Sequence, residues 1–261
     1  ESEVDTPYRL PLQEVGCVSC GQCVSACPVG AVTTQRTQFG ARPWQTEKVR
    51  TVCSYCANGC ELLVHSYNGR VVKVTADLEQ GLNQGNLCVR GRFGQGFANA
   101  PDRVLKPLVR NAAGELEETT WHAALDRIAS EAEAAKASGG DAFAAIVGAQ
   151  STNETAFLVA RLAREVFGSQ NVASCDLSKR RAADEVLRAT VGSTSASWAS
   201  NDRTDLARAD VILLVGSNIT ESNPVLALTI IKAMRQGKTV IVVDPRITES
   251  AQRAKIHLAV R

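Results

Sequence analysis

From about residue 102 onward, short continuous apolar runs alternate along the chain with longer stretches whose apolar residues recur at helical spacing. The apolar runs have the length and composition of buried strands and lie at residues 142–148 (AFAAIVG), 210–216 (DVILLVG) and 238–244 (KTVIVVD). The helical stretches between them cover residues 153–168 and 223–237, and each ends in a glycine suited to a helix C-terminus. This alternation predicts an α/β fold, with a Rossmann-like parallel sheet and covering helices in residues 102–261.

The region before residue 102 has a different pattern. The sequence ELLVHSYNGRVVKVTA contains two apolar runs on either side of Asn68-Gly69, which predicts a β-hairpin with a two-residue turn. We therefore expect a β-rich domain over residues 47–101. Residues 1–46 are dense in Cys, Gly and Pro and show little apolar periodicity, so either a bound metal or a neighbouring domain must hold this third, smaller module together.

The composition narrows the class of partner. The 261 residues are 44% hydrophobic and 21% charged, as in ordinary soluble proteins, and the net charge is +2. A charge so close to zero gives no electrostatic reason to expect nucleic acid or an anionic membrane surface as a partner. The longest apolar runs, such as residues 211–215, are too short to cross a bilayer, so we expect no direct membrane insertion.

The nine cysteines are the most informative feature of the composition. Eight of them fall into two tight groups, and this spacing favours metal binding in a reducing compartment over a disulfide framework. We therefore expect a cytoplasmic protein, either free or peripheral to a membrane complex. Residue 1 is Glu and the single methionine is Met234, so we also expect further chain upstream.

The first group is GCVSCGQCVSACPVGA, with Cys17, Cys20, Cys23 and Cys27 followed directly by Pro28. This is the run C-x2-C-x2-C-x3-C-P of bacterial ferredoxins, which predicts a ferredoxin-like [4Fe-4S] module in residues 1–46. A zinc site is the alternative, although four-cysteine zinc sites usually come as two separated pairs.

The last cysteine of this run, Cys27, is expected to bind a different cluster from the other three. In two-cluster ferredoxins the fourth cysteine binds the other cluster. We therefore expect Cys17, Cys20 and Cys23 to share one cluster, and Cys27 to face a sister cluster whose remaining ligands lie upstream.

The second group consists of Cys53, Cys56, Cys60 and Cys88, in the spacing C-x2-C-x3-C-x27-C. A long excursion before the last ligand suits a [4Fe-4S] cluster whose fourth thiolate comes from another loop. Gly59, Gly85 and Gly91 lie close by in the sequence, as expected where backbone packs around a bulky inorganic group. Zinc is again the alternative on spacing alone.

The stretch C-x2-C-x3-C-x27-C-V-R-G-R-F-G resembles the molybdopterin oxidoreductases, in the branch of cytoplasmic formate dehydrogenase alpha subunits and the G subunit of NADH-quinone oxidoreductase. The resemblance extends over nearly the whole chain, through PDRVLKPLVR, TWHAALDRIA, LLVGSNITESNPV and VVDPR. The ferredoxin run ahead of the second group is closer to the formate dehydrogenase arrangement. The resemblance implies that Arg90, where the family usually has Lys, lies between the second cluster and the pterin.

The catalytic residues of that family are not apparent. In formate dehydrogenases the corresponding region has a pattern similar to N-V-D-x-C-A-R-x-C-H. This chain has NVASCDLSKRR there. An ungapped comparison places Cys175 at the non-catalytic cysteine and Lys179 and Arg180 at the catalytic Cys-His pair. An ammonium is a poor ligand for molybdenum, and a guanidinium cannot accept a proton at neutral pH. We therefore expect Cys175 to be a small structural residue and the chain to bind no molybdopterin.

Other candidate residues have structural interpretations. The loops Gly216-Ser217-Asn218 and Asp244-Pro245-Arg246 would contact a pterin in the family, but loops at the carboxyl ends of parallel strands also arise from the fold alone. His65, His122 and His257 have no ligand pattern around them, and we expect them to be structural.

The sequence thus predicts an electron-transfer subunit with at least two [4Fe-4S] clusters and no substrate site of its own. We expect its partners to be flavin- or NADH-binding and other iron-sulfur subunits of an NADH- or formate-linked complex. A fragment of a molybdenum formate dehydrogenase alpha subunit is one alternative, and a zinc-stabilised scaffold is another.

Overall fold

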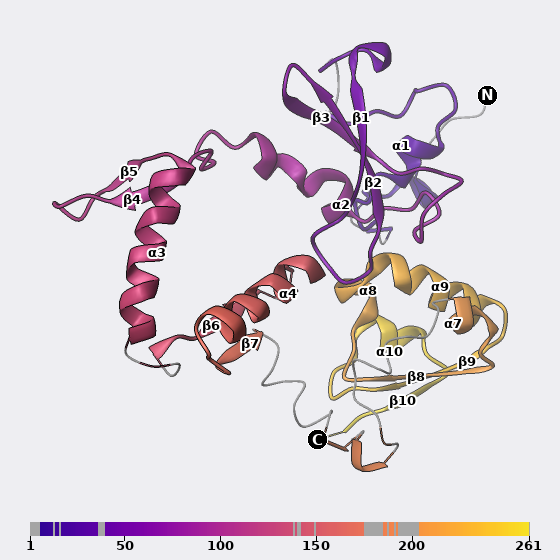
Figure 1. Ribbon diagram of the computed structural model, residues 1–261. Coiled ribbons are helices and arrows are strands. Elements are labelled where there is room, and N and C mark those ends of the chain that lie inside the picture. Colours follow the sequence, from indigo (N-terminus) through magenta and orange to yellow (C-terminus); the bar gives the residue numbers. More distant parts are fainter. Residues whose placement is uncertain are drawn as a thin grey trace. The chain divides into compact units, whose positions relative to one another are not determined.

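The structure is a computed structural model that describes residues 6–12, 14–15, 17–35, 40–137, 139, 142–148, 150–174, 185–186, 188–190, 192 and 204–260. The chain divides into two compact units (Figure 1). Unit 1 combines Glu1–Pro101 with Asp202–Arg261, and unit 2 is Asp102–Asn201. This division groups residues differently from the three domains expected at 1–46, 47–101 and 102–261, and those domain boundaries stay a prediction.

The N-terminal part of unit 1 contains a three-stranded antiparallel sheet in the order β1-β2-β3. Its strands are β1 (Glu47–Val52), β2 (Glu61–Tyr67) and β3 (Arg70–Thr75). Asn68 and Gly69 join β2 to β3 with φ angles of 49° and 71°, and a two-residue hairpin turn of this kind requires positive φ at both positions. The predicted hairpin is therefore confirmed.

Short helices surround this sheet. They are η1 (Pro7–Arg9), α1 (Gln22–Ala26), η2 (Pro43–Gln45), α2 (Val89–Phe93) and η3 (Gly94–Asn99). The buried residues form a small cluster made of Cys53, Cys60, Leu62, Val74 and Leu87. Two predicted metal ligands are thus part of the core itself.

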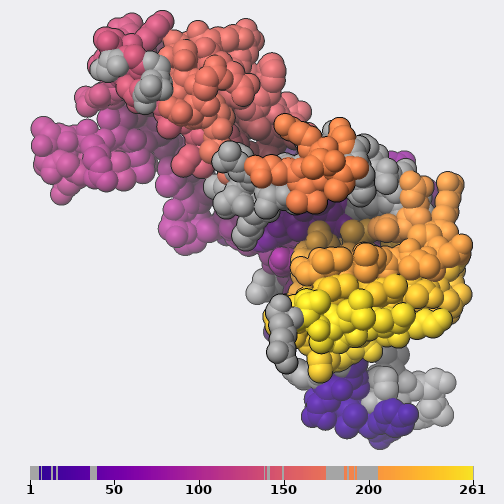
Figure 2. Space-filling view, turned by 90° about the horizontal axis from the view of Figure 1, so that it is seen from below, coloured from indigo at the N-terminus to yellow at the C-terminus, as the bar shows by residue number. Residues whose placement is uncertain are grey.

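The C-terminal part of unit 1 is a parallel sheet in the order β10-β9-β8. The strands are β8 (Val211–Val215), β9 (Thr239–Val243) and β10 (Ile256–Leu258). The helices are α7 (Thr204–Arg208), α8 (Ile219–Ser222), α9 (Pro224–Arg235) and α10 (Glu249–Arg253). Figure 1 shows α8, α9 and α10 on one side of the sheet, and in Figure 2 the yellow C-terminal residues pack together with the orange ones without a gap.

One face of this sheet carries most of the apolar core. Ile212 and Leu214 are buried, whereas Val211, Leu213 and Val215 are 59–64% exposed. The continuous apolar run predicted a strand buried on both faces. Within the described residues the helices cover only the face that contains the even-numbered side chains, so the alternation along β8 is that of a half-buried strand.

Unit 2 contains a β-hairpin, a long helix and a two-stranded parallel sheet. Its elements are β4 (Leu108–Arg110), β5 (Leu116–Glu118), α3 (Trp121–Ala137), β6 (Ala145–Val147), α4 (Asn153–Arg161), the π-helix η5 (Leu162–Val166) and β7 (Val172–Ser174). Phe143 stacks on Phe167 with a centroid separation of 3.9 Å. The helix predicted over residues 153–168 is confirmed as α4 and η5, and Gly168 follows it with φ 65°.

The strand predicted in residues 142–148 differs from expectation. Only Ala145–Val147 is a strand, its middle residue Ile146 is 75% exposed, and it pairs with β7 in a sheet of its own. The predicted parallel pairing is confirmed in both units, but the described strands form two parallel sheets instead of one. A three-residue strand with a single partner cannot bury both of its faces.

None of the helices in the described part of the chain is both long enough and apolar enough to span a membrane.

The core of the C-terminal sheet makes a direct stability prediction. Ile230 on α9 is 2% exposed and packs in the cluster with Val240 and Val242. Ile230→Ala should reduce the free energy of unfolding by about 2–5 kcal/mol because it leaves a cavity. Ile247→Ala is the matched control, since Ile247 is 74% exposed. Equal denaturant midpoints for the two variants would contradict this description of the core.

Candidate metal centres

The loop between β1 and β2 brings together three cysteines of the second group. Cys53 follows β1 directly, Cys60 precedes β2, and Cys56 lies between them. The backbone N–H of Cys53 donates to the carbonyl of Cys60 at 2.8 Å, which closes the loop at its base. Cys53 and Cys60 are buried, and Cys56 is half-buried.

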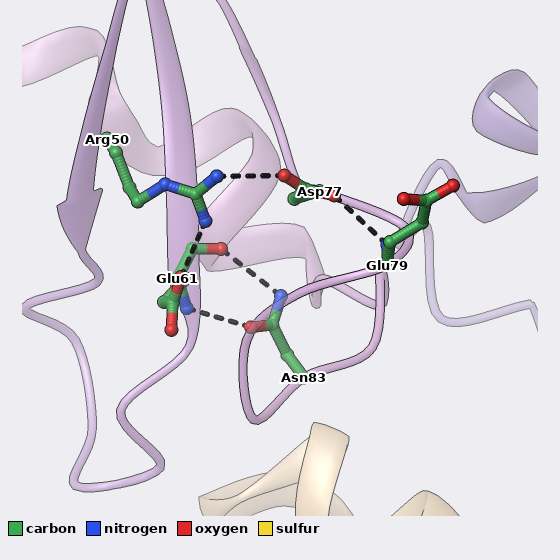
Figure 3. Close-up of polar contacts among 5 residues, drawn as sticks. All are labelled: Arg50, Glu61, Asp77, Glu79 and Asn83. Atoms are coloured by element: carbon green, nitrogen blue, oxygen red, sulfur yellow. Dashed lines mark hydrogen bonds and ion pairs between the residues drawn. The ribbon is translucent and has the colours of Figure 1, made fainter.

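The side chain of Asn83 holds the segment before the fourth cysteine beside this loop, a contact that we call the Asn83 clasp; its two hydrogen bonds to Glu61 are drawn in Figure 3. Asn83 is 2% exposed. Its Oδ1 accepts from the N–H of Glu61 at 2.8 Å, and its Nδ2 donates to the carbonyls of Glu61 at 3.2 Å and Asn86 at 2.9 Å. Because Glu61 follows Cys60 and Asn86 precedes Cys88 by two residues, one side-chain amide holds the two ligand-bearing segments side by side.

A second, more exposed contact supports the same arrangement. Arg50 on β1 lies between Glu61 and Asp77, with both N–O distances at 2.9 Å (Figure 3). The N–H of Glu79, together with Arg50, lowers the pKa of Asp77. Since the Arg50 side chain is 44% exposed, solvent screens this network and the Asn83 clasp remains the stronger constraint.

Burial governs the ionisation of the two innermost thiols of this group, Cys53 and Cys60. Burial raises the pKa of Cys53, and the charges of Cys88 and Cys56 raise it further. Burial also raises the pKa of Cys60, against the hydrogen bond that Asn58 Nδ2 donates to Cys60 Sγ at 2.8 Å. The thiols of Cys53 and Cys60 therefore resist ionisation without a cation, and a bound metal centre would reverse this by supplying positive charge.

These residues fit a thiolate-ligated cluster. Three of the four sulfur donors share one loop, one of them accepts an N–H···S hydrogen bond, and Gly91 lies close enough that an added Cβ would be 3.8 Å from Cys53 Sγ. Among the described residues, no three His, Cys, Asp or Glu side chains converge as they would around a single metal ion. That result concerns one ion, whereas the thiolates of a cubane bind different irons and lie farther apart.

The first cysteine group surrounds α1. Gly21 precedes this helix with φ 69°, a conformation that suits glycine, and Cys27 ends it in an extended conformation. Cys17 and Cys23 are exposed, and Cys20 and Cys27 are half-buried. The pKa of Cys27 is lowered, chiefly by the backbone N–H of Val32, with smaller contributions from residues 29–31. The turn after Pro28 thus directs amide dipoles at this sulfur.

Two different cavities meet the first group. One, of about 620 Å³, is lined by Cys27 together with Val32, Lys48 and His65. The other, of about 380 Å³, is lined by Cys20 of the first group and Cys88 of the second, with apolar walls that include Val18, Leu87, Val225 and Leu228. Cys27 and Cys20 therefore line separate spaces.

Arg90 lines the cavity that Cys20 and Cys88 also line. Its Nη2 donates to the carbonyls of Glu221 at 3.1 Å and Ser222 at 3.0 Å, at the end of α8. Arg90 thus connects α2 to the segment that follows the Gly216-Ser217-Asn218 loop. Its predicted role beside a pterin stays a prediction.

The remaining candidates have structural partners or lie outside the described residues. His65 shares a hydrogen bond with Thr75, His257 with the carbonyl of Asp244, and His122 pairs with Asp126 on the surface. Asn218 accepts from Thr220 and Ser250, and Asp244 from the N–H of Arg246, so both loops are held by their own side chains. Cys175, Lys179 and Arg180 are outside the described residues.

Comparison with known families identifies the family of this chain. The model of the molybdopterin oxidoreductase family matches residues 103–261, that of the molybdopterin oxidoreductase Fe4S4 domain matches residues 46–100, and that of a 4Fe-4S binding domain matches residues 15–33. The chain belongs to the molybdopterin oxidoreductase family and contains 4Fe-4S binding domains. The expected absence of molybdopterin gains no support from these matches.

Curated relatives are similar over most of the chain. The NADPH-Fe(3+) oxidoreductase subunit alpha of Geobacter sulfurreducens is 35% identical over 92% of this chain and 27% of its own length. A candidate formate dehydrogenase of Staphylococcus haemolyticus is 33% identical over 94% of this chain and 29% of its own length. The second G subunit of NADH-quinone oxidoreductase from Rhizobium meliloti is 35% identical over 85% and 25%. The chain therefore spans less than a third of the length of these relatives.

A solved structure supports the fold. The acetylene hydratase of Pelobacter acetylenicus superposes with a TM-score of 0.69 over 82% of this chain and 29% of its own, at 22% identity. At this identity the similarity concerns the fold alone, and it confirms the predicted mixed α/β class.

The Asn83 clasp leads to a testable prediction. Asn83→Ala leaves the half-buried N–H and carbonyl of Glu61 without their Asn83 partner, which should reduce the free energy of unfolding by about 1–3 kcal/mol. It should also release Cys88 and slow the incorporation of iron into the second cysteine group. Asn153→Ala, at an exposed position on α4, is the control. Identical iron-loading rates in the two variants would contradict the role given to the clasp.

Proposed function

We propose that this chain relays electrons between two [4Fe-4S] clusters inside a larger molybdopterin oxidoreductase, without a substrate site of its own. The observation that carries the proposal is the apolar cavity lined by both Cys20 and Cys88. Cys20 and Cys88, one from each cysteine group, line the same cavity of unit 1, which would give electrons a short path between the groups.

In this proposal Cys53, Cys56, Cys60 and Cys88 hold the second cluster, and Cys17, Cys20 and Cys23 hold the first. A [4Fe-4S] cluster exchanges single electrons at a potential set by its net charge, hydrogen bonds and exposure. Residues of this chain would influence the potential of the second cluster in two ways. Asn58 donates a hydrogen bond to Cys60 Sγ, and the apolar residues around Cys53 exclude water. Cys27 would face a sister cluster, which is supported by its position on a cavity that does not include Cys20.

The partners we propose are flavin- or NADH-binding and other iron-sulfur subunits, in the cytoplasm. Two relatives carry the names of subunits, one of an NADPH-Fe(3+) oxidoreductase and one of NADH-quinone oxidoreductase, which supports a redox complex. The reducing compartment is supported by the clustered cysteines.

The ligand assignment is tested by removing one thiolate. Cys56→Ala should abolish the EPR signal of the second cluster and remove its iron, about four atoms per chain, because the substitution disrupts the ligand set that holds that cluster. Cys175→Ser is the matched control and should keep the full iron content. An unchanged iron content in Cys56→Ala would refute the assignment.

A second candidate function has a specific observation in its favour. The molybdopterin oxidoreductase match over residues 103–261 and the relationship to a candidate formate dehydrogenase favour a fragment of a molybdenum enzyme. The choice depends on Lys179 and Arg180, which supply neither a soft metal ligand nor a proton acceptor at neutral pH.

Metal analysis separates the candidates. We expect the purified protein to contain iron and acid-labile sulfide, no stoichiometric molybdenum or zinc, and no formate-dependent dye reduction. Stoichiometric molybdenum with formate turnover that disappears in Cys175→Ser would establish the enzyme instead, and stoichiometric zinc without iron would establish the scaffold.

A further inference from the structure

Arg92 is a buried cation that connects the two cysteine groups. It lies on α2, four residues after Cys88, and is 7% exposed. Its guanidinium extends into the first group: Nε donates to the carbonyl of Cys20 at 2.8 Å, Nη1 to Ser25 Oγ at 2.6 Å and Nη2 to Gln22 Oε1 at 2.9 Å. These acceptors all belong to the segment that holds Cys20 and Cys23.

The charge of Arg92 is the unusual feature. Its three hydrogen bonds end on neutral acceptors, and among the described residues no carboxylate forms an ion pair with it. Burying a cation without an opposite charge is expensive. Because Nε donates to the backbone carbonyl of Cys20, the sulfurs of Cys20 and Cys23 are the groups placed to supply the opposite charge when they bind metal. The position is therefore favourable when these sulfurs are ionised, as they are when they bind metal.

Two further contacts fix the same interface. Gln22, which accepts from Arg92, also donates through Nε2 to the carbonyl of Gly85 at 3.5 Å, in the segment that leads to Cys88. Gly21 packs so closely that an added Cβ would lie 2.6 Å from Phe93 and 2.7 Å from the Arg92 side chain. The first group's loop is thus docked on α2, the helix that begins at a ligand of the second group.

We propose that Arg92 is a positioning residue that fixes the first cluster against the second and makes the first cluster easier to reduce. This inference rests on the proposed electron relay, in which one electron leaves one cluster as the other cluster gains it. A nearby fixed cation stabilises the more negative, reduced form. The three-way fork of a guanidinium also holds the loop in one orientation, which a single ammonium cannot do.

The experiment separates the charge from the geometry. Redox titration followed by EPR on the anaerobically reconstituted protein gives the midpoint potential of each cluster and the magnetic interaction between them. Arg92→Gln should disfavour reduction of the first cluster at least tenfold, a shift of about 59 mV to more negative potential for one electron, and should weaken the interaction. Arg70→Gln, at an exposed position on β3, is the control and should change neither quantity.

Two variants keep the inference testable if Arg92→Gln does not retain the first cluster. Arg92→Lys keeps the charge and Gln22→Ala keeps the guanidinium, so both should keep the potential within tenfold of wild type while altering the magnetic interaction. The inference would be overturned if the Arg92 and Gln22 variants had the same midpoint potentials and the same magnetic interaction as the control Arg70→Gln. A wild-type protein without two clusters would instead refute the proposed function, so the two failures are distinguishable.

Discussion

The side-chain amide of Asn83 is the contact on which the rest of the candidate site depends. It joins the backbone beside Cys60 to the backbone before Cys88, across an excursion of more than twenty residues. By placing Cys88 it also places α2, and α2 carries Arg92 into the loop of the first cysteine group. Because few residues around these loops are buried, directed polar contacts take over the role that a large apolar core has elsewhere.

Spacing and periodicity predicted much of the site's scaffold, and the reasons are local. The hairpin at Asn68-Gly69, the helix that ends before Gly168 and the parallel pairing of β8 with β9 all follow from short-range patterns. The partners of the ligands could not be predicted in this way. Asn83 and Arg92 act through hydrogen bonds to residues distant in sequence, and a buried arginine looks the same in a sequence as an exposed one.

The sequence also could not predict which side chains of the apolar runs are exposed. The residues of β6 and the odd-numbered side chains of β8 have the composition of a two-sided core, yet Ile146 and Leu213 are largely exposed in the described part of the chain. Strand composition reports what a residue could bury, whereas its neighbours decide what it does bury. The same limit applies to the pterin loops, since Asn218 and Asp244 form hydrogen bonds that stabilise their own turns whether or not a cofactor is present.

The central claim is that two separate iron clusters lie in unit 1 and share the space between Cys20 and Cys88. Anomalous diffraction at the iron edge, from crystals of the anaerobically reconstituted protein, tests it most directly. The account predicts two compact groups of iron, one enclosed by Cys53, Cys56, Cys60 and Cys88 and the other by Cys17, Cys20 and Cys23. Iron at only one of these positions, or a single zinc ion at either, would contradict it.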